Sequence, residues 1–341
     1  MRDPTNLLAG RRIVLQSLTR PSSLCERRRT LYTYLMITKH ASNGLLWIDL
    51  ESPSQEEIHS VSKDYNLNPL VTHELSAPSV RSQVDLYQNF IYLILHFPRL
   101  KRGSGKKEER EQEIDFVIGK RFLITVRYGG SEVIHYVSKL FDTKATLGEG
   151  DFGSHAGFIF SFLIEKLYES LLHELNAAGE SLCTIEERIY GGQERNMVIA
   201  LANVSRELLF VKRSLAMHRE VLESFEVAGK KLFGEKFAFH LRALIGGYYR
   251  VAHAVDGNTA FLLELRETNN ALLSTKQNEI MKTIAVLAFI ALPATTVLSL
   301  FQIDTLSRPI VGLPFDFWIL LLMVGAVVLG LFAWFKRRRW L

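Results

Sequence analysis

The chain has 341 residues, of which 48% are hydrophobic and 23% are charged, a composition usual for a folded protein and unusual for a disordered one. Its net charge of +5 at pH 7 is not accompanied by interleaved aromatic and basic residues or by zinc-finger spacing, which argues against nucleic-acid binding. The two cysteines, Cys25 and Cys183, have no Cys/His ligand spacing around them, so we expect neither a disulfide framework nor a structural zinc site.

Residues 1–43 form a basic extension that we expect to be disordered. Arginine is frequent in residues 1–35, where Asp3 and Glu26 are the acidic residues. This composition fits three origins: an organelle transit peptide, a disordered tail, or translated upstream sequence before a start at Met36. We favour the last two. The region has no secretory hydrophobic segment, so we expect the domain that follows to stay in the cytoplasm.

Residues 44–150 combine strand and helix patterns, and we predict an α/β domain. The strands alternate apolar and polar residues, and the first helix is marked by Ser52-Pro53 followed by acidic residues, which suit a first helical turn. The predicted elements are a strand at 44–50, a helix that begins near Ser52, a strand pair at 84–97, a strand pair at 113–128 that turns at Gly119-Lys120, and a helix at 131–141.

After the α/β domain the apolar residues recur at helical spacing, and we predict two long cytoplasmic helices over 151–232. The first ends at Gly191-Gly192 and the second covers about 193–227. A third helix begins near Phe233 and has no strong stop signal before the apolar C-terminal region. We therefore predict a stalk helix over 233–282 that continues directly into this region.

Two uncharged apolar runs follow, at 283–303 and 317–335. Each approaches the about 20 residues that an α-helix needs to cross the hydrocarbon core of a bilayer. We predict two transmembrane helices, joined by an outside loop at 304–316 and followed by a basic cytoplasmic tail at 336–341.

Basic residues set the expected orientation of these spans. Lys282 directly precedes the first span and the run from Lys336 to Arg339 follows the second, whereas the connecting loop carries one arginine, Arg308. By the positive-inside rule, both termini then lie in the cytoplasm. We expect a multi-pass protein of the cell membrane, that is, of an inner or plasma membrane.

One face of the first span is narrow and partly polar. Its members recur at spacings of three and four residues and are Met281, Ile284, Ala288, Leu292, Thr295 and Ser299. Pro293 interrupts the same helix and removes one backbone hydrogen bond. Two interpretations remain open: a functional polar surface, or packing against another helix, which also favours small residues.

Four motifs in the chain match those of one known membrane-protein family. Asn278-Glu279-Ile280-Met281-Lys282 is followed by Pro293, and the chain ends in Trp334-Phe335-Lys336-Arg337-Arg338-Arg339-Trp340-Leu341. The stretches LLWIDLESPSQEE and LNPLVTHEL lie in the N-terminal part. With these motifs the chain resembles the CorA family of divalent-cation channels over roughly residues 44–341.

The resemblance implies an α/β cytoplasmic domain followed by long α-helices and two C-terminal transmembrane helices, assembled as a funnel-shaped homopentamer. It also implies a transmembrane channel or transporter for divalent metal cations, with Mg²⁺ as the main cargo, and no enzymatic activity. The face from Met281 to Ser299 would line the pore. The family ends its first span in Tyr-Gly-Met-Asn, whereas this chain has Phe301-Gln302-Ile303-Asp304. We therefore assign the ion-selecting mouth to Gln302, Ile303 and Asp304, with the Asp304 carboxylates as metal ligands.

The resemblance implies further roles along the same helix. Met281 and Leu292 would form hydrophobic constrictions that gate the pore. Glu267 matches a stalk position that binds regulatory Mg²⁺, although an ordinary solvated charge explains it equally well. A basic collar at the inner mouth would consist of Lys282, Lys336, Arg337, Arg338 and Arg339. Anchoring of the topology and contact with anionic lipids would account for the same residues.

Two other functions fit the sequence. The first is a non-conducting CorA-like membrane scaffold or ion sensor that kept the fold and lost the filter. The second is a ZntB-like zinc transporter. In each case the expected partners are further copies of the chain, membrane lipids and divalent cations, and nucleic acid is not among them.

Overall fold

The structure of the protein is a computed structural model that describes residues 37–79, 81–99, 111–147, 153–302 and 315–338. The chain divides into two compact units. The first consists of the residues up to Arg99, Gly105–Leu167 and Met217–Ile245, and the second mainly of Tyr168–Ala216 and Gly246–Leu341. Residues 1–36, most of the predicted basic extension, lie outside the described residues.

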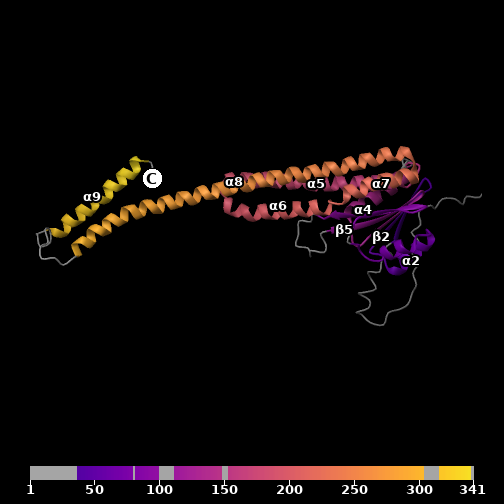
Figure 1. Ribbon diagram of the computed structural model, residues 1–341, viewed down its shortest axis with the longest axis horizontal. Coiled ribbons are helices and arrows are strands. Elements are labelled where there is room, and N and C mark those ends of the chain that lie inside the picture. Colours follow the sequence, from indigo (N-terminus) through magenta and orange to yellow (C-terminus); the bar gives the residue numbers. More distant parts are fainter. Residues whose placement is uncertain (1–36, 80, 100–110, 148–152, 303–314, 339–341) are drawn as a thin grey trace, which may run out of the picture. The chain divides into compact units, whose positions relative to one another are not determined.

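A six-stranded sheet forms the centre of the first unit (Figure 1). Its strand order is β1-β2-β6-β5-β4-β3. The β2 and β6 strands are parallel, and every other neighbouring pair is antiparallel. The strands are β1 Ile37–Ser42, β2 Leu45–Glu51, β3 Gln83–Leu86, β4 Phe90–Pro98, β5 Glu111–Gly119 and β6 Phe122–Arg127.

Two short helices of this unit begin at side chains that cap their first backbone N–H groups. Helix α2 (Gln55–Asp64) follows Ser54, whose hydroxyl accepts a hydrogen bond from the Glu57 N–H, while the Glu57 carboxylate accepts one from the Ser54 N–H at 2.8 Å. Helix α3 (Pro69–Glu74) follows Asn68, whose Oδ1 accepts from the Leu70 N–H at 2.9 Å. These caps fix the residues at which α2 and α3 begin.

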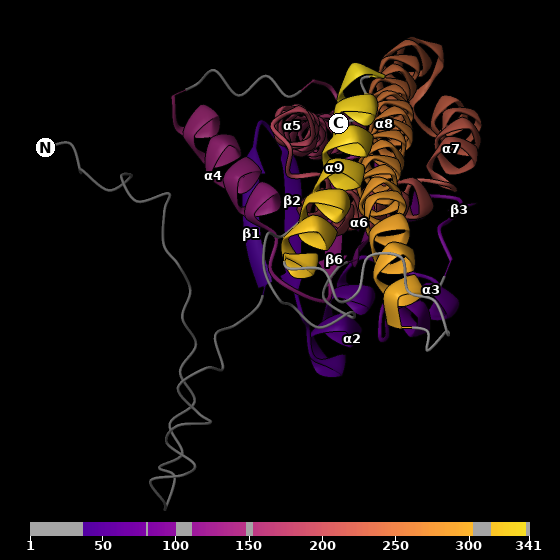
Figure 2. The ribbon, with the colours of Figure 1, turned by 90° about the vertical axis from the view of Figure 1, so that its left-hand side faces the viewer.

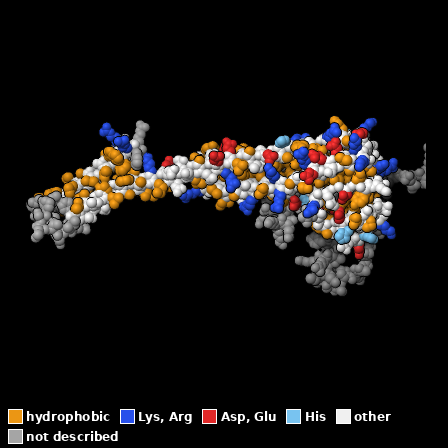
Figure 3. All heavy atoms as spheres, in the orientation of Figure 1, with side chains coloured by type: hydrophobic (Ala, Val, Ile, Leu, Met, Phe, Trp, Pro, Cys, Tyr) orange, Lys and Arg blue, Asp and Glu red, His pale blue; other side chains and the backbone are white. Residues whose placement is uncertain are grey.

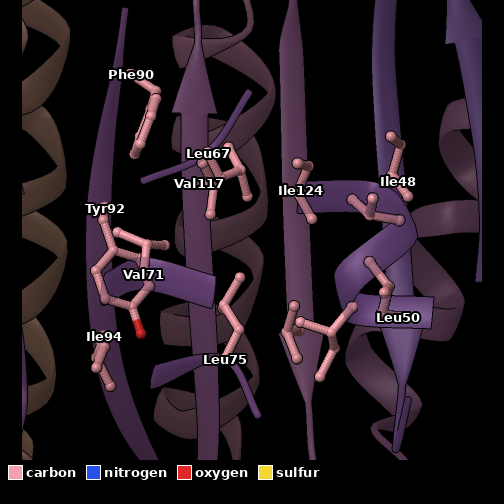
Figure 4. Close-up of a cluster of buried hydrophobic side chains, with 13 residues drawn as sticks. Ile48, Leu50, Leu67, Val71, Leu75, Phe90, Tyr92, Ile94, Val117 and Ile124 are labelled. Atoms are coloured by element: carbon pink, nitrogen blue, oxygen red, sulfur yellow. The ribbon is translucent and has the colours of Figure 1, made fainter. Parts of the chain in front are cut away.

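Helices α2 and α3 cover one face of the sheet and form a hydrophobic core with it (Figure 4). Val71 and Leu75 lie against strand residues such as Tyr92 and Val117, all of them fully or almost fully buried. Burying one such aliphatic side chain stabilises the fold by about 1.5–3 kcal/mol. The core residues are Ile48, Leu50, Ile58, Val61, Leu67, Val71, Leu75, Phe90, Tyr92, Ile94, Val117, Ile124 and Val126.

The opposite face of the sheet is covered by α4 (Glu132–Thr146), the first part of α5 (Gly157–Tyr190) and α7 (His218–Phe233) (Figure 2). An aromatic chain links the layers: the ring of Phe160 packs 5.1 Å from that of Phe116 on β5 and 4.7 Å from that of Phe225 on α7. Both faces of the central strands are therefore buried, and polar residues on either face of these strands are withdrawn from water.

The second unit is a bundle made of the rest of α5, α6 (Glu194–Ser214) and most of α8 (Glu235–Gln302). Helix α6 is antiparallel to α8, because Lys212 pairs with Asp256 and Glu194 pairs with Lys276. Helix α5 runs in the same direction as α8, and the Asn258 amide donates a hydrogen bond to the Leu175 carbonyl at 2.8 Å. The bundle core includes Leu182, Ile185, Leu201, Leu262 and Leu265.

The last part of α8 and helix α9 (Asp316–Arg337) are each long and apolar enough to cross a membrane. They contain the two predicted spans, and Pro293 lies inside α8. The two helices meet at Phe289 and Phe335, whose ring centroids are 6.3 Å apart, and Val286 is almost fully buried there. Most other side chains of both segments are exposed hydrophobic groups (Figure 3).

The α/β domain begins earlier than predicted. We assigned residues 1–43 to a disordered extension, but Ile37–Ser42 is strand β1 and pairs with β2. The edge strand is held by His40, which is buried against the Trp47 ring at 5.1 Å and hydrogen-bonds the Asp142 carboxylate at 2.7 Å.

The helix predicted over 193–227 is interrupted at residues 215–217, so the described residues between the α/β domain and α8 form three helices rather than the two predicted. The reason lies in His218, the first residue of α7, which is fully buried against β4. Its Nε2 lies 2.9 Å from the His96 carbonyl, so this nitrogen carries the hydrogen and donates it. Phe97 packs edge-on against the same ring at 4.9 Å.

Candidate functional site

The predicted pore-lining residues lie on one exposed face of α8. Met281, Ile284 and Leu292 have exposed fractions of 57%, 53% and 62%. Ala288, Thr295 and Ser299 are also exposed. Among the described residues, this face is therefore uncovered along its whole length, from Met281 to Ser299. We refer to these six residues as the exposed α8 face.

Helix α9 meets α8 away from the exposed α8 face, where the ring centroids of Phe289 and Phe335 are 6.3 Å apart. Val286 is buried, and Ile290, Pro293 and Val297 are half-buried. These residues are offset by two positions from members of the exposed α8 face, which corresponds to about 200° around an α-helix. The partly polar face of α8 is therefore not used for packing within one chain, because α9 of the same chain lies on the other side of α8.

Hydroxyl groups near Pro293 bond to the backbone of their own helix. Thr295 and Thr296 both donate to the Leu292 carbonyl, at 2.9 and 2.8 Å, and Ser299 donates to the Thr295 carbonyl at 2.8 Å. Each hydroxyl uses its single hydrogen in this bond, so its oxygen remains an acceptor. Thr295 and Ser299 thus add acceptor oxygens to the exposed α8 face, and such oxygens suit cations or their hydration water.

The predicted ion-selecting mouth lies almost entirely outside the described residues. Gln302 is the last residue of α8, and its side chain is not described. Ile303 and Asp304 fall in the segment that the structure leaves out. The structure therefore shows only that α8 ends at Gln302, and the assignment of the mouth to Gln302, Ile303 and Asp304 stays a prediction.

Basic residues gather at the other end of the two spans. Lys282 follows Met281 on α8 and is exposed, and Lys336 and Arg337 are exposed at the end of α9. The contact between Phe289 and Phe335 brings these ends of the two helices to the same side. Arg338 lies over the Trp334 ring, 5.8 Å from its centroid, and Arg339 is outside the described residues.

Glu267 lies on the part of α8 that precedes the span, and its side chain is exposed. In the described part of the chain, no group of three or more His, Cys, Asp or Glu side chains is arranged to hold a metal ion. A metal site at Glu267 would thus need oxygens from other copies of the chain. Glu267 precedes Met281 by 14 residues, or two heptads. In a helix that packs in a supercoil, residues a whole number of heptads apart lie on the same face, so Glu267 and Met281 share one.

Sequence reasoning missed the extension of this face toward the N-terminal end of α8. Asn270, Ser274 and Asn278 continue the same spacing between Glu267 and Met281, and all three are exposed. The signal was present in the sequence: it is a heptad series of small or polar uncharged residues on a helix whose other positions include Leu262, Leu265 and Lys276.

A family model described as CorA-like Mg²⁺ transporter protein matches residues 42–337. The chain belongs to the CorA family. The family resemblance drawn from the sequence motifs is therefore confirmed, as is the fold class of an α/β domain followed by long helices and two apolar C-terminal helices.

Relatives and solved structures of CorA proteins are similar to this chain over most of its length. The cobalt/magnesium transport protein CorA of Thermotoga maritima is 18% identical and covers 86% of this chain and 83% of its own. The zinc transport protein ZntB of Pectobacterium atrosepticum is 26% identical, with coverages of 86% and 88%. The CorA magnesium transporter structure from Methanocaldococcus jannaschii superposes with a TM-score of 0.75 at 18% identity, covering 89% of this chain and 98% of that one.

Proposed function

We propose that the protein is a homopentameric channel or transporter for divalent metal cations, with Mg²⁺ as the main cargo, whose pore is lined by the exposed α8 face. The observation that carries this proposal is the division of the first span into two faces. One side contains the buried Val286 and the Phe289 ring that contacts Phe335 of α9, whereas the other is exposed and carries acceptor oxygens near Pro293.

Two helices per chain cannot enclose a water-filled path, so conduction requires several copies around an axis. The exposed α8 face then meets its symmetry mates at the axis, and the exposed hydrophobic side chains elsewhere on α8 and α9 face lipid. Met281 and Leu292 form rings of apolar groups that act as constrictions, because water leaves a narrow apolar passage readily.

The cation would be held through oxygen atoms. Mg²⁺ prefers oxygen ligands and gives up its hydration water reluctantly, so hydroxyl oxygens such as those of Thr295 and Ser299 would contact the hydrated ion. At the outer mouth, Asp304 carboxylates would attract divalent cations, with Gln302 and Ile303 shaping the entrance. Conduction also requires that this attraction be weak enough for the ion to leave.

The same arrangement suggests a regulatory metal site and a basic collar below the pore. Glu267 side chains from neighbouring copies would bind Mg²⁺ below the pore and hold the channel closed when the ion is plentiful. Lys282 and the basic run that begins at Lys336 would form a positive collar at the inner mouth. These assignments place both termini in the cytoplasm and the protein in the cell membrane as a multi-pass protein.

The test is ion uptake into proteoliposomes that contain the purified full-length protein and a metal-sensitive dye. Thr295→Val removes one hydroxyl from the exposed α8 face and should reduce Mg²⁺ uptake several-fold. Thr296→Val is the matched control, because its hydroxyl bonds the same Leu292 carbonyl but lies outside that face. Equal uptake by both variants would contradict the assignment of the pore face.

The ZntB relatives and the replaced Gly-Met-Asn triplet make zinc the second candidate cargo. The same assay should therefore be run with Mg²⁺, Co²⁺ and Zn²⁺ separately. Uptake of Zn²⁺ alone would identify a zinc transporter. Uptake of none of the three by the wild-type protein would identify a non-conducting scaffold or ion sensor.

A further inference from the structure

Two acidic side chains lie side by side inside the sheet of the first unit. Glu113 and Asp115 are alternate residues of β5, so both point to the face that α2 and α3 cover. Asp115 is fully buried, and Glu113 retains 8% of its exposure. Tyr92 from the neighbouring strand β4 lies on the same face (Figure 4).

The two oxygens of Asp115 have different surroundings. Its Oδ2 accepts a hydrogen bond from the Tyr92 hydroxyl at 3.2 Å, and the Tyr128 hydroxyl lies 3.5 Å away. Tyr128 has one hydrogen and is closer to the Leu75 carbonyl, at 3.1 Å. Oδ1 of Asp115 is buried and has no hydrogen-bond partner among the described residues. A buried carboxylate oxygen without a donor is costly, whereas a protonated oxygen is itself a donor.

Glu113 has the surroundings of an ionised carboxylate. Both of its oxygens lie 2.8 Å from the Ser79 N–H, and His96 Nε2 is 3.5 Å from its Oε2. Burial lowers the pKa of His96, but the hydrogen bonds to Glu113 and to the Ser79 carbonyl outweigh it, so the pKa is raised overall. Glu113 therefore accepts from groups on two sides, while Asp115 lacks a donor on one side.

No cationic side chain other than His96 compensates these two acids in the described part of the chain. The titratable groups that face them are Glu74 on α3, Tyr92 and His96 on β4, Glu111 on β5, and Tyr128 after β6. Burial, together with the adjacent Glu113, raises the pKa of Asp115 well above its ordinary value. Asp49 gives the contrast: it is also buried in the sheet but pairs with the Arg127 guanidinium at 2.9 Å.

We propose that Glu113 and Asp115 form a proton-binding site in which Asp115 keeps its proton at neutral pH and donates it from Oδ1 to the Glu113 carboxylate. The proton comes from solution, and its loss leaves two adjacent buried anions that repel each other. The Glu113 carboxylate also holds the Ser79 N–H, and Tyr128 holds the Leu75 carbonyl. Loss of the proton as the pH rises above neutral therefore weakens the attachment of the α3–β3 connection to the sheet, so the site makes this connection sensitive to alkaline pH.

The first test compares two aspartate-to-asparagine variants of the full-length protein in detergent. Asp115→Asn replaces a protonated acid by a neutral amide that can donate to Glu113 and accept from Tyr92, so the unfolding midpoint at pH 7 should stay at or above the wild-type value. Asp49→Asn is the matched control and should lower the midpoint, because it removes the partner of Arg127. A drop for Asp115→Asn as large as that for Asp49→Asn would overturn the proposal.

The second test detects the proton directly in the wild-type fold. Infrared spectra at neutral pH should contain a band of a protonated carboxylic acid that shifts when aspartate is labelled with ¹³C at its side-chain carboxyl. The measurement is made in an Asp304→Asn background, so that the predicted outer ring does not contribute. A labelled spectrum without a shifted band would overturn the proposal, whatever the stability of Asp115→Asn.

Discussion

His155 is expected to govern part of the acid response of the first unit. Its ring stacks on Phe233 at 4.3 Å and packs edge-on against Phe237 at 4.6 Å, and its Nδ1 is buried without a partner among the described residues. Burial, followed by the charge of His240, lowers the pKa of His155 from 6.5 to about 4. Between these values the unfolded chain binds a proton that the folded chain does not, so stability falls as the pH drops from 6.5 toward 4.

His155→Phe should therefore stabilise the protein more at pH 5 than at pH 8. Phenylalanine fits an aromatic environment and cannot be protonated, so we expect a rise in the unfolding midpoint of about 2–4 °C at pH 5 and little change at pH 8. Circular dichroism during heating measures this. The exposed His59→Phe is the control and should show no such pH-dependent difference. An equal shift at both pH values would rule out titration of His155 as the cause.

The two buried aspartates show where residue-level prediction stopped. The stretch Glu113 to Phe116 was correctly predicted as part of a strand, because apolar and polar residues alternate. The same alternation suggests that the polar residues face water. They do not, because helices cover both faces of β5, and that fact depends on sheet order and on helices distant in the sequence. Asp49 and Arg127 likewise meet through the β2–β6 pairing, which local sequence does not reveal.

At the scale of elements, the start of α6 is tied to α8 just before the apolar part of α8. The Lys276 Nζ donates to the Glu194 carboxylate at 2.7 Å and lies 3.4 Å from the Gly192 carbonyl. The Glu194 side chain retains 6% of its exposure. The hydrogen bond from Lys276 lowers the pKa of Glu194, so the tie is lost as the pH falls through that lowered pKa.

Lys276→Met should loosen the α5–α6 turn, because it leaves the withdrawn Glu194 carboxylate without its cation. We expect a several-fold faster amide hydrogen exchange in residues 188–198, measured by mass spectrometry on the full-length protein. The matched control is Lys212→Met, which removes an equally short pair with Asp256 whose side chains are both about 60% exposed. This control should leave exchange near its own pair unchanged. Faster exchange in both variants, or in neither, would contradict the role of the tie.

Element prediction succeeded where a local signal was strong. The strand pairs were placed within a few residues because alternating runs are bounded by turns, and the Gly191-Gly192 break ends α5 as expected. The break at residues 215–217 was missed because nothing in the local pattern stops a helix there. It is imposed by the burial of His218 against β4, a contact between residues far apart in the chain.

At the scale of the whole molecule, the membrane segment was the most predictable part. Long uncharged runs have few alternative structures, and the spacing of Met281 to Ser299 correctly grouped residues that share one exposed face. The bundle that precedes the span was less predictable. Asn270 and Ser274 can be assigned to the same face as Met281 only because α8 continues from the bundle into the span without interruption. The mouth at Ile303 and Asp304 remains a prediction.

The assembled protein should respond to the width of its apolar rings. Leu292→Ala shortens a side chain on the exposed α8 face, widens the proposed constriction, and should raise resting Mg²⁺ uptake into proteoliposomes several-fold. Leu300→Ala is the control, because Leu300 is as exposed as Leu292 but lies outside that face. Native mass spectrometry should find five copies of the 38.9 kDa chain in both variants. Unchanged uptake by Leu292→Ala in an intact pentamer would argue against a gate at this ring.

Pro293 gives the long helix a joint in the middle of the membrane. A proline has no N–H, so the Phe289 carbonyl one turn earlier loses its usual donor. Thr295 and Thr296 donate to the Leu292 carbonyl instead and do not replace that bond. The helix therefore bends most easily at Pro293. This position divides the exposed α8 face into a part with Met281 and Ile284 and a part with Thr295 and Ser299. The half of the helix that contains Ser299 can therefore bend relative to the half that contains Met281, so one end of the exposed α8 face can move while the other stays in place.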